Sequence, residues 1–499
     1  MMTSPKSFHS APHSLVQSAV AAQVRKSLPH PGLMSESKTL RGIADILEKL
    51  PHPRETAYRK PMLAVSATVQ TSPFSAACMG LLLQFAWAVI TGNTQLQQEI
   101  RNDFVDSGCD PGWLSAVADY VVAYWIDRDT IPYIPPQSTT DPTFIYALPE
   151  KPSLRIGILA DWGTGDQVAS YVLQQMMQQT PAPDLILHLG DVYYAGTSDE
   201  VQKNFVDLLN TYAPTMPVYN LPGNHDMYSG GGAFYAVMPT FNHGRSFAGG
   251  NQPAPLQGAS FFCLRNSWLQ LQGMDTGYYD SDLFDVSKDT TQLHPLEAAW
   301  HLDKIQNAGG RAVFLFSHHQ AWSAFLPIGS GPIHTPRALA ESPITMSTWE
   351  NIHLQSAFAK VPSGTVRAWF WGHEHVLEVY DQAAIAKSLV NGQPLGGEFN
   401  WLPYAACVGY SAFPQFESDK PYQTYDYGPN IALQYNQSFQ LGMSGPPNTE
   451  PVYDHGFTIL DVNSDGSAVA TYFSVPGDGS SNTSKSLGQS IIASSSSAC

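Results

Sequence analysis

The chain has 499 residues and a formal net charge of −17, from 25 basic and 42 acidic side chains. Charged residues make up 13% of the sequence, against about 25% in average soluble domains. This balance excludes a general affinity for nucleic acid or anionic membrane surfaces, because both kinds of binding need basic patches. If the substrate carries phosphate, a bound cation must attract it locally.

Residues 1–130 form the first predicted region, and we expect it to be α-helical. Apolar residues recur at helical spacing in four segments, 15–20, 40–50, 74–91 and 113–125. The run from Phe74 to Ile90 reaches the short limit of a membrane span, about 17–25 residues, but it contains Gln84. We therefore expect a buried helix without stable membrane insertion. The region is a candidate cap for a catalytic domain or a surface for oligomerisation.

The first thirty residues contain no continuous apolar segment of the kind found in secretory signal peptides. A cytoplasmic location is therefore expected, with export by an unrecognised route as the alternative. Residues 131–153 are rich in proline and are predicted to be a linker. Residues 476–499 are rich in serine and are predicted to be a disordered tail.

Residues 154–475 form the predicted catalytic domain. Apolar strand-like runs alternate with helical segments from Leu154 onward, which is typical of a mostly parallel sheet with helices outside it. Residues 261–265 and 268–271 flank a turn and predict an antiparallel hairpin. A further strand pair is predicted over 456–462 and 468–474.

Five short blocks of metal-ligand residue types follow five of the predicted strands. They are Asp161-Trp162-Gly163, Gly190-Asp191-Val192-Tyr193-Tyr194, Gly223-Asn224-His225-Asp226, Ser317-His318-His319 and Gly372-His373-Glu374-His375. In α/β sheets, ligands bind beyond the carboxyl ends of the strands. Carboxylates and imidazoles suit iron, zinc and manganese, and an aspartate at a strand end can bridge two ions. The blocks therefore predict a two-metal centre, and neither a P-loop nor a nucleophile elbow accompanies them.

These blocks resemble those of the calcineurin-like metallophosphoesterase superfamily over roughly residues 154–475. The tyrosine that ends the second block resembles, more narrowly, the G-D-x-x-Y block of the purple acid phosphatases. The resemblance implies a four-layer α/β sandwich, in which two mixed β-sheets are flanked by helices, here preceded by an α-helical N-terminal region. It also implies hydrolysis of phosphate esters, with two metal ions that orient the phosphate and generate the attacking hydroxide.

The resemblance also implies a role for each ligand. Fe(III) would be held by Asp161, Tyr194 and His375, and Asp191 would bridge the two ions. A divalent Fe, Zn or Mn ion would be held by Asn224, His318 and His373. His225 would bind a phosphate oxygen or protonate the leaving alkoxide.

The sequence departs from the purple acid phosphatase pattern at the second substrate-facing histidine. The usual spacing falls near Pro327, so His319 and His334 are the two candidates for this role. Arg245, in a loop rich in glycine, is a candidate for gripping a phosphate oxygen, with a surface arginine as the alternative.

Three functions remain open from the sequence. The first is a phosphomonoesterase of acid phosphatase type that acts on a small phosphorylated substrate. The second is a phosphodiesterase acting on cyclic nucleotides, nucleotide diphosphates or phospholipid head groups. The third is a binding protein with a relic metal site. Each of the predicted ligand positions keeps a metal-binding residue type, which disfavours the third.

Overall fold

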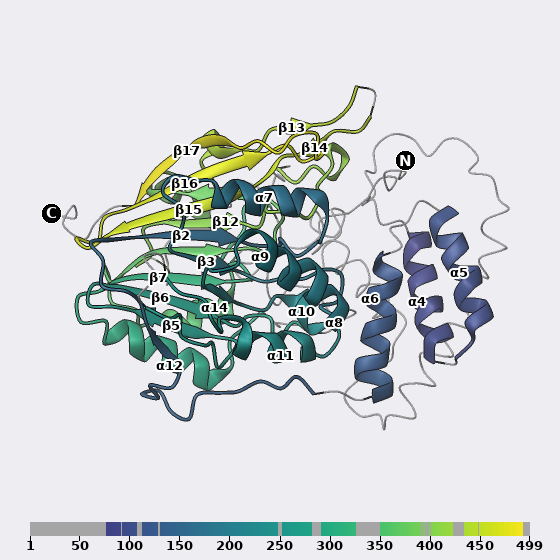
Figure 1. Ribbon diagram of the computed structural model, residues 1–499, viewed down its shortest axis with the longest axis horizontal. Helices are drawn as coiled ribbons and strands as arrows, with labels where there is room; N and C mark the ends of the chain where they lie inside the picture. The colour runs from purple at the N-terminus through teal and green to yellow at the C-terminus, as the bar shows by residue number, and fades with distance from the viewer. Residues whose placement is uncertain are drawn as a thin grey trace.

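The structure is a computed structural model of the chain. It describes residues 76–90, 92–106, 112–127, 130–247, 252–281, 291–325, 350–390, 393–394, 399, 401–422, 434–447 and 449–492. The helices predicted over 15–20 and 40–50 lie outside these residues. Figure 1 shows the described part as a layered α/β body with three helices of the N-terminal region packed at one end.

The N-terminal helices are α4 (Ala76–Ile90), α5 (Thr94–Asp106) and α6 (Gly112–Tyr120), and α6 continues as the π-helical segment η2 (Val121–Asp127). They share a core of their own, to which Leu82, Phe85 and Phe104 contribute fully or almost fully buried side chains. Leu81, Leu82 and Phe85 of α4 are buried in this core, and α4 contacts α5 and α6, so it is a buried helix as expected. No helix in the described part of the chain is long and apolar enough to cross a membrane.

One six-stranded sheet has the order β17-β16-β15-β2-β3-β4. Its strands are β2 (Ser153–Leu159), β3 (Leu185–His188), β4 (Val218–Asn220), β15 (His455–Asn463), β16 (Ala468–Val475) and β17 (Lys485–Ile492). Strands β2, β3 and β4 are parallel, whereas β15, β16 and β17 are joined in antiparallel pairs and β15 runs antiparallel to β2. The sheet is therefore mixed.

The second large sheet has seven strands in the order β1-β5-β6-β7-β8-β12-β9. They are β1 (Ile145–Ala147), β5 (Phe262–Arg265), β6 (Leu269–Met274), β7 (Ala312–Ser317), β8 (Val366–Trp371), β9 (Leu377–Tyr380) and β12 (Ala405–Val408). Strands β6, β7, β8 and β12 are parallel neighbours, and β5 and β6 form the predicted hairpin. Two small two-stranded sheets pair β10 (Leu389–Val390) with β11 (Gln393–Pro394) and β13 (Met443–Ser444) with β14 (Val452–Tyr453).

The remaining helices lie on the outer faces of the sheets or in the connections between strands. They are α7 (Gln167–Met177), α8 (Ser198–Glu200), η3 (Val201–Val206), α9 (Asp207–Tyr212), α10 (Asn224–Met227), α11 (Gly232–Phe241), α12 (Pro295–Gln306), α14 (Ile352–Phe358) and α15 (Gln382–Lys387). Two short 3₁₀ segments are η5 (Glu417–Asp419) and η6 (Gln437–Phe439).

The main core lies between the two large sheets, where Ile156 and Leu187 of one sheet belong to the same cluster as Leu271 and Phe314 of the other. The outer face of the six-stranded sheet packs against α7 and α9. The outer face of the seven-stranded sheet packs against α12 and α14. The predicted fold, a four-layer sandwich of two mixed sheets flanked by helices, is confirmed.

Two segments differ from the prediction. Residues 485–492 of the expected disordered tail form β17, because Leu487 and Ile492 pack on the main core while the backbone pairs with β16. Residues 145–147 of the expected linker form β1, because the backbone pairs with β5 and Tyr146 is buried in the core. The linker was predicted from its proline content and the tail from its serine content. In both segments the apolar residues decided the structure instead, because they pack on the main core.

Candidate metal centre

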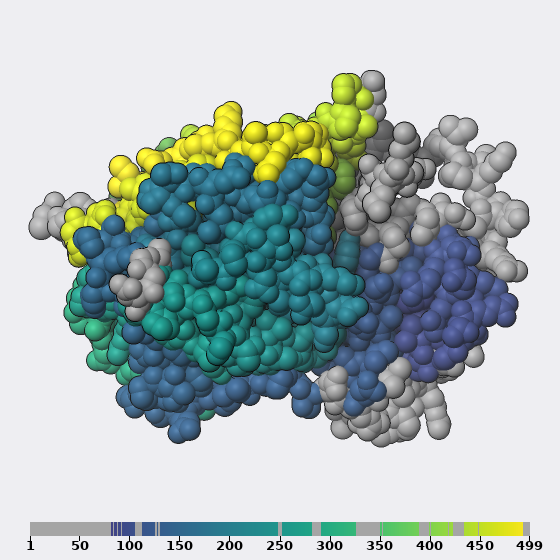
Figure 2. All heavy atoms as spheres, viewed as in Figure 1, coloured from purple at the N-terminus to yellow at the C-terminus, as the bar shows by residue number. Residues whose placement is uncertain are grey.

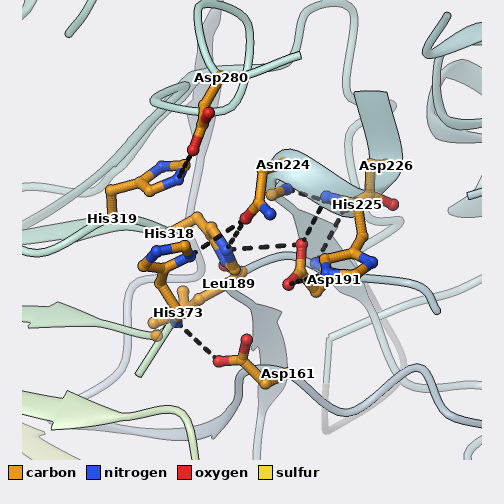
Figure 3. Close-up of polar contacts among 12 residues, drawn as sticks. Asp161, Leu189, Asp191, Asn224, His225, Asp226, Asp280, His318, His319 and His373 are labelled. Carbon is orange, nitrogen blue, oxygen red and sulfur yellow. Dashed lines mark hydrogen bonds and ion pairs between the residues drawn. The ribbon is translucent and has the colours of Figure 1, made fainter. Parts of the chain in front are cut away.

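The five blocks meet at one edge of the sandwich. Asp161, Asp191 and Asn224 follow the parallel strands β2, β3 and β4, whereas His318 and His373 follow the parallel strands β7 and β8. Because all five strands end at this edge, side chains more than two hundred residues apart in sequence point toward one another, as Figure 3 shows. Asp161, Asp191, Asn224 and His318 are fully buried.

The backbone at this edge takes conformations that side chains rarely adopt. Asp161, Asp191 and His373 have φ angles of 55°, 73° and 68°, in the left-handed region. Non-glycine residues persist there only where the surrounding structure enforces it, and such strain clusters at functional sites. Gly223 has no room for a side chain, since a Cβ there would collide with the carboxylate of Asp191.

One group of ligand atoms surrounds the side-chain oxygen of Asn224. The distances from Asn224 Oδ1 to His318 Nε2 and to His373 Nδ1 are both 3.1 Å. Asp191 Oδ1 lies 3.5 Å from His318 Nε2. Atoms that share one ion at roughly 2.0–2.2 Å lie about 3 Å apart, so this group has the spacing of a metal site.

The ring proton of His318, in this first group, is engaged outside the group. His318 Nδ1 donates to the carbonyl of Leu189 at 2.8 Å. Burial, and then the neighbouring His319 and His373, lower the pKa of His318 well below its usual range, so the ring is neutral. Its Nε2 therefore presents a lone pair to the oxygens of Asn224 and Asp191. Acceptors that face acceptors in a buried site repel each other, and a cation between them removes this repulsion.

A second group surrounds a phenol oxygen. Tyr193 Oη lies 2.9 Å from Asp161 Oδ1, 3.0 Å from Asp191 Oδ2 and 3.0 Å from His375 Nε2. Asp161 Oδ1 and His375 Nε2 are 3.4 Å apart. A single phenolic proton cannot neutralise two buried carboxylates. The second group thus also has the composition and spacing of a cation site.

Asp191 joins the two groups, because its Oδ1 faces His318 and its Oδ2 faces Tyr193. Burial and then the charge of Asp161 raise the pKa of Asp191 well above its usual range. Two ionised carboxylates in so small a buried volume repel each other, and positive charge between them removes this repulsion. Carboxylate, imidazole, amide and phenol donors therefore fit a pair of metal ions at this edge.

Tyr194, the phenol ligand predicted from the sequence, lies outside the second group. Its ring is 6.0 Å from the ring of Trp113, centroid to centroid, and it packs with the core of the N-terminal helices. Its backbone N–H donates to the Glu200 carboxylate, which holds this part of the loop. The structure brings Tyr193 into the place expected for Tyr194. Sequence reasoning did not consider Tyr193, although the two tyrosines are adjacent and both follow β3.

His225 lies beside the two ligand groups and is fully buried. Its Nδ1 donates to the carbonyl of Tyr194, and its Nε2 lies 4.0 Å from Asp191 Oδ2. The next residue, Asp226, was part of a block but received no role. Its Oδ2 accepts from the backbone N–H groups of Asp191 at 2.9 Å and Gly223 at 2.8 Å, so it ties two ligand-bearing loops together.

The remaining predicted site residues are placed differently from one another. His319 borders the first group, since its ring lies 4.4 Å from that of His373, centroid to centroid, and it could hold an ion together with His318 and His373. His319 contacts Thr276 Oγ1 through Nδ1 and Asp280 Oδ2 through Nε2, both at 2.9 Å, and its ring turns toward Asp280 in Figure 3. Arg245 is buried away from the ligand groups, because its guanidinium donates to the carbonyls of Ala213 and Met216. His334 lies outside the residues that the structure describes.

Comparison with known proteins identifies a family that is similar to part of the chain. Residues 154–377 match the family model described as calcineurin-like phosphoesterase. No curated protein matches the chain. A solved structure titled "GAP50 the anchor in the inner membrane complex of Plasmodium" matches with 13% sequence identity and a TM-score of 0.36, covering 68% of this chain and 89% of that chain. A likeness of this size does not bear on function. In sequence, residues 154–377, which contain both candidate ligand groups, are similar to the calcineurin-like phosphoesterases.

Proposed function

We propose that the protein hydrolyses phosphomonoesters at a two-metal centre. The observation that carries this proposal is Asp191, whose two carboxylate oxygens face two separate groups of ligand atoms. Two ions held by these groups would supply Lewis acidity and activate a water for attack on phosphorus. The match of residues 154–377 to calcineurin-like phosphoesterases supports the same reaction class.

The two groups would hold different ions. Asn224, His318 and His373 offer one amide oxygen and two imidazoles, which suit a divalent Fe, Zn or Mn ion. In the second group, Asp161 and His375 contact a phenol oxygen. A phenolate is a ligand that favours Fe(III). We propose Tyr193 as this phenolate, because its oxygen is within 3.0 Å of ligand atoms from Asp161, Asp191 and His375.

His225 would act on the substrate side of the centre. Its Nδ1 is tied to the carbonyl of Tyr194, which fixes the ring so that Nε2 points toward Asp191. A phosphate bound at the two ligand groups would place an oxygen near this Nε2. The imidazole would then bind that oxygen or give a proton to the leaving alkoxide.

A pair of matched substrates tests the proposal. The protein, loaded with iron and zinc, is assayed against p-nitrophenyl phosphate and bis-p-nitrophenyl phosphate, with bound metal measured on the same sample. We expect the monoester to have the higher kcat/KM. Preference for the diester would instead support a phosphodiesterase. Hydrolysis of neither ester by protein that holds two ions would refute an enzymatic role on such esters.

A further inference from the structure

The N-terminal helices lie outside the segment that matches the phosphoesterase family, yet they contact the candidate centre. Their core also includes Ala195 and Tyr228, two residues of the loops that carry the second and third blocks. Figure 1 shows α6 beside the end of the sandwich that bears α8 and α10, and Figure 2 shows the helices packed against this end. A region with its own core therefore rests on the loops of the site.

Three contacts define this junction. Trp113 of α6 lies 5.8 Å from the ring of His225 and 6.0 Å from the ring of Tyr194, centroid to centroid. Tyr124 of η2 donates its hydroxyl to the carbonyl of Met227 at 2.7 Å. Gly112 has no room for a side chain, because a Cβ there would collide with the ring of Tyr194. The approach of α6 to the site is thus close.

His225 is enclosed by aromatic rings from both regions. The rings of Tyr193 and Tyr228 lie 4.5 Å and 4.8 Å from it, and Trp113 lies 5.8 Å from it. Both tyrosines are tied to the ligand groups, since Tyr193 Oη contacts Asp161 and Tyr228 Oη accepts from Asn224 at 2.7 Å. Trp113 is 3% exposed and belongs to the N-terminal helices. Of these three rings, it is therefore the one that can move or be replaced without disturbing a ligand residue.

We propose that Trp113 is a specificity-determining residue, which forms the wall of the active site beside His225 and limits the size of the leaving group. This inference rests on the proposed phosphoesterase function. In an in-line displacement the leaving group departs opposite the attacking oxygen, and a histidine that protonates it must lie next to its path. Among the described residues, the rings of Tyr193, Tyr228 and Trp113 lie around His225, and the indole of Trp113 is the largest of these three.

The kinetic experiment compares Trp113→Ala and Trp113→Phe with the unmodified full chain on methyl phosphate and 1-naphthyl phosphate. We expect Trp113→Ala to raise the ratio of kcat/KM for the naphthyl ester to that for the methyl ester by about tenfold or more, and Trp113→Phe to fall between. Val122→Ala is the matched control, because Val122 lies on the continuation of α6 and is 39% exposed. A ratio that stays within twofold in both Trp113 variants would overturn the proposal.

A binding experiment separates failure of this inference from failure of the proposed function. Methylphosphonate and 1-naphthylphosphonate cannot be hydrolysed, so their affinities for metal-loaded protein are measured by calorimetry without turnover. Trp113→Ala should strengthen binding of the naphthyl compound relative to the methyl compound. If Trp113→Ala strengthens this binding but the protein hydrolyses no ester, the role of Trp113 as a wall is supported and the enzymatic proposal is refuted. If the protein hydrolyses esters and Trp113→Ala changes neither the ratio of kcat/KM values nor the ratio of affinities, only the proposal for Trp113 is refuted.

Hydrogen exchange checks that each variant keeps its fold. In the unmodified chain, peptides covering residues 192–196 and 224–229 should be protected, and Trp113→Phe should keep this protection. If Trp113→Ala loses protection throughout the N-terminal helices, Trp113→Phe replaces it in the kinetic test. For Trp113→Phe we expect the ratio of kcat/KM for the naphthyl ester to that for the methyl ester to change by about threefold. An unchanged ratio in a folded Trp113→Phe protein would then overturn the proposal.

Discussion

Two of the buried acidic clusters in the described part of the chain neutralise their charge in different ways. In the candidate metal centre, the lone pair on His318 Nε2 faces the side-chain oxygens of Asn224 and Asp191. In the second cluster, formed by Asp275 and Glu297 and here called the α12 cluster, each oxygen of Glu297 accepts a hydrogen bond. Tyr133 Oη donates at 2.7 Å and the Asp275 N–H at 2.8 Å.

Burial raises the pKa of Glu297 to about 8. Burial and then Glu297 raise the pKa of Asp275 to about 7. The neighbouring His301 cannot serve as a counter-ion, since burial lowers its pKa to about 3. The α12 cluster is therefore neutralised by protons. Acceptors that face acceptors indicate a cation site, whereas in the α12 cluster burial keeps Glu297 protonated although the donors Tyr133 and Asp275 N–H favour its charged form.

The largest expected effect comes from Asp191→Ala. Removing the carboxylate shared by both ligand groups should release both ions and lower kcat by at least about a thousandfold. Bound metal is measured by plasma mass spectrometry after reconstitution. Asp275→Asn is the matched control, because it replaces a buried acid outside both ligand groups, and it should keep two ions. Equal metal loss in both variants would contradict the distinction between the clusters.

The next effect separates the two ions. His318→Ala removes a ligand from the first group and leaves Asp161, Tyr193 and His375 in place, so the metal content should fall from two equivalents toward one. Affinity for the remaining ion should change by less than about tenfold. Loss of both ions together would show that the two groups do not bind independently.

The two tyrosines give a spectroscopic test. Protein loaded with Fe(III) should show a visible phenolate-to-iron absorption band. Tyr193→Phe should abolish this band, and Tyr194→Phe should keep it, because Tyr194 packs against Trp113 instead. The reverse result would assign the phenolate to Tyr194, as the sequence predicted. A band that persists in both variants would exclude either phenolate as the source.

The smallest effect concerns the pH dependence of stability. The pKa of Glu297 is about 8 in the folded chain and about 4.3 when unfolded. Between these values the folded state binds more protons, so the free energy of unfolding should decrease as pH rises, by up to about 1.4 kcal/mol per pH unit. Glu297→Gln should make this decrease smaller, because it removes the contribution of Glu297 and leaves that of Asp275, as measured by urea unfolding between pH 5 and 8. Parallel curves for both proteins would refute a proton-neutralised cluster.

The sequence predicted those features that depend on a local pattern of residue types. Apolar runs located the strands, and the ligand residue types after them located the metal centre, because the end of a buried strand fixes where the next side chains lie. The choice between Tyr193 and Tyr194 was not accessible in this way. Both residues follow the same strand, and the path of the chain between Asp191 and Glu200 decides which ring turns inward.

Other roles depend on partners that are remote in sequence. Arg245 looked like a phosphate ligand because its charge is visible in the sequence, whereas the carbonyls of Ala213 and Met216 that bind it are not. The contact between Trp113 and His225 joins residues 112 positions apart (225 − 113 = 112) across two regions. Such pairings follow from tertiary packing rather than from local periodicity.

The pairing of β2 with β15 has a consequence for any shortened form of this protein. The strand that leads to Asp161 is hydrogen-bonded to β3 on one side and to residues 458–463 on the other. A chain cut after residue 377, where the family match ends, would lose that second neighbour. It would expose an unpaired strand edge, which is a template for aggregation. The smallest piece able to fold around both ligand groups therefore extends well beyond the recognisable motif-bearing segment.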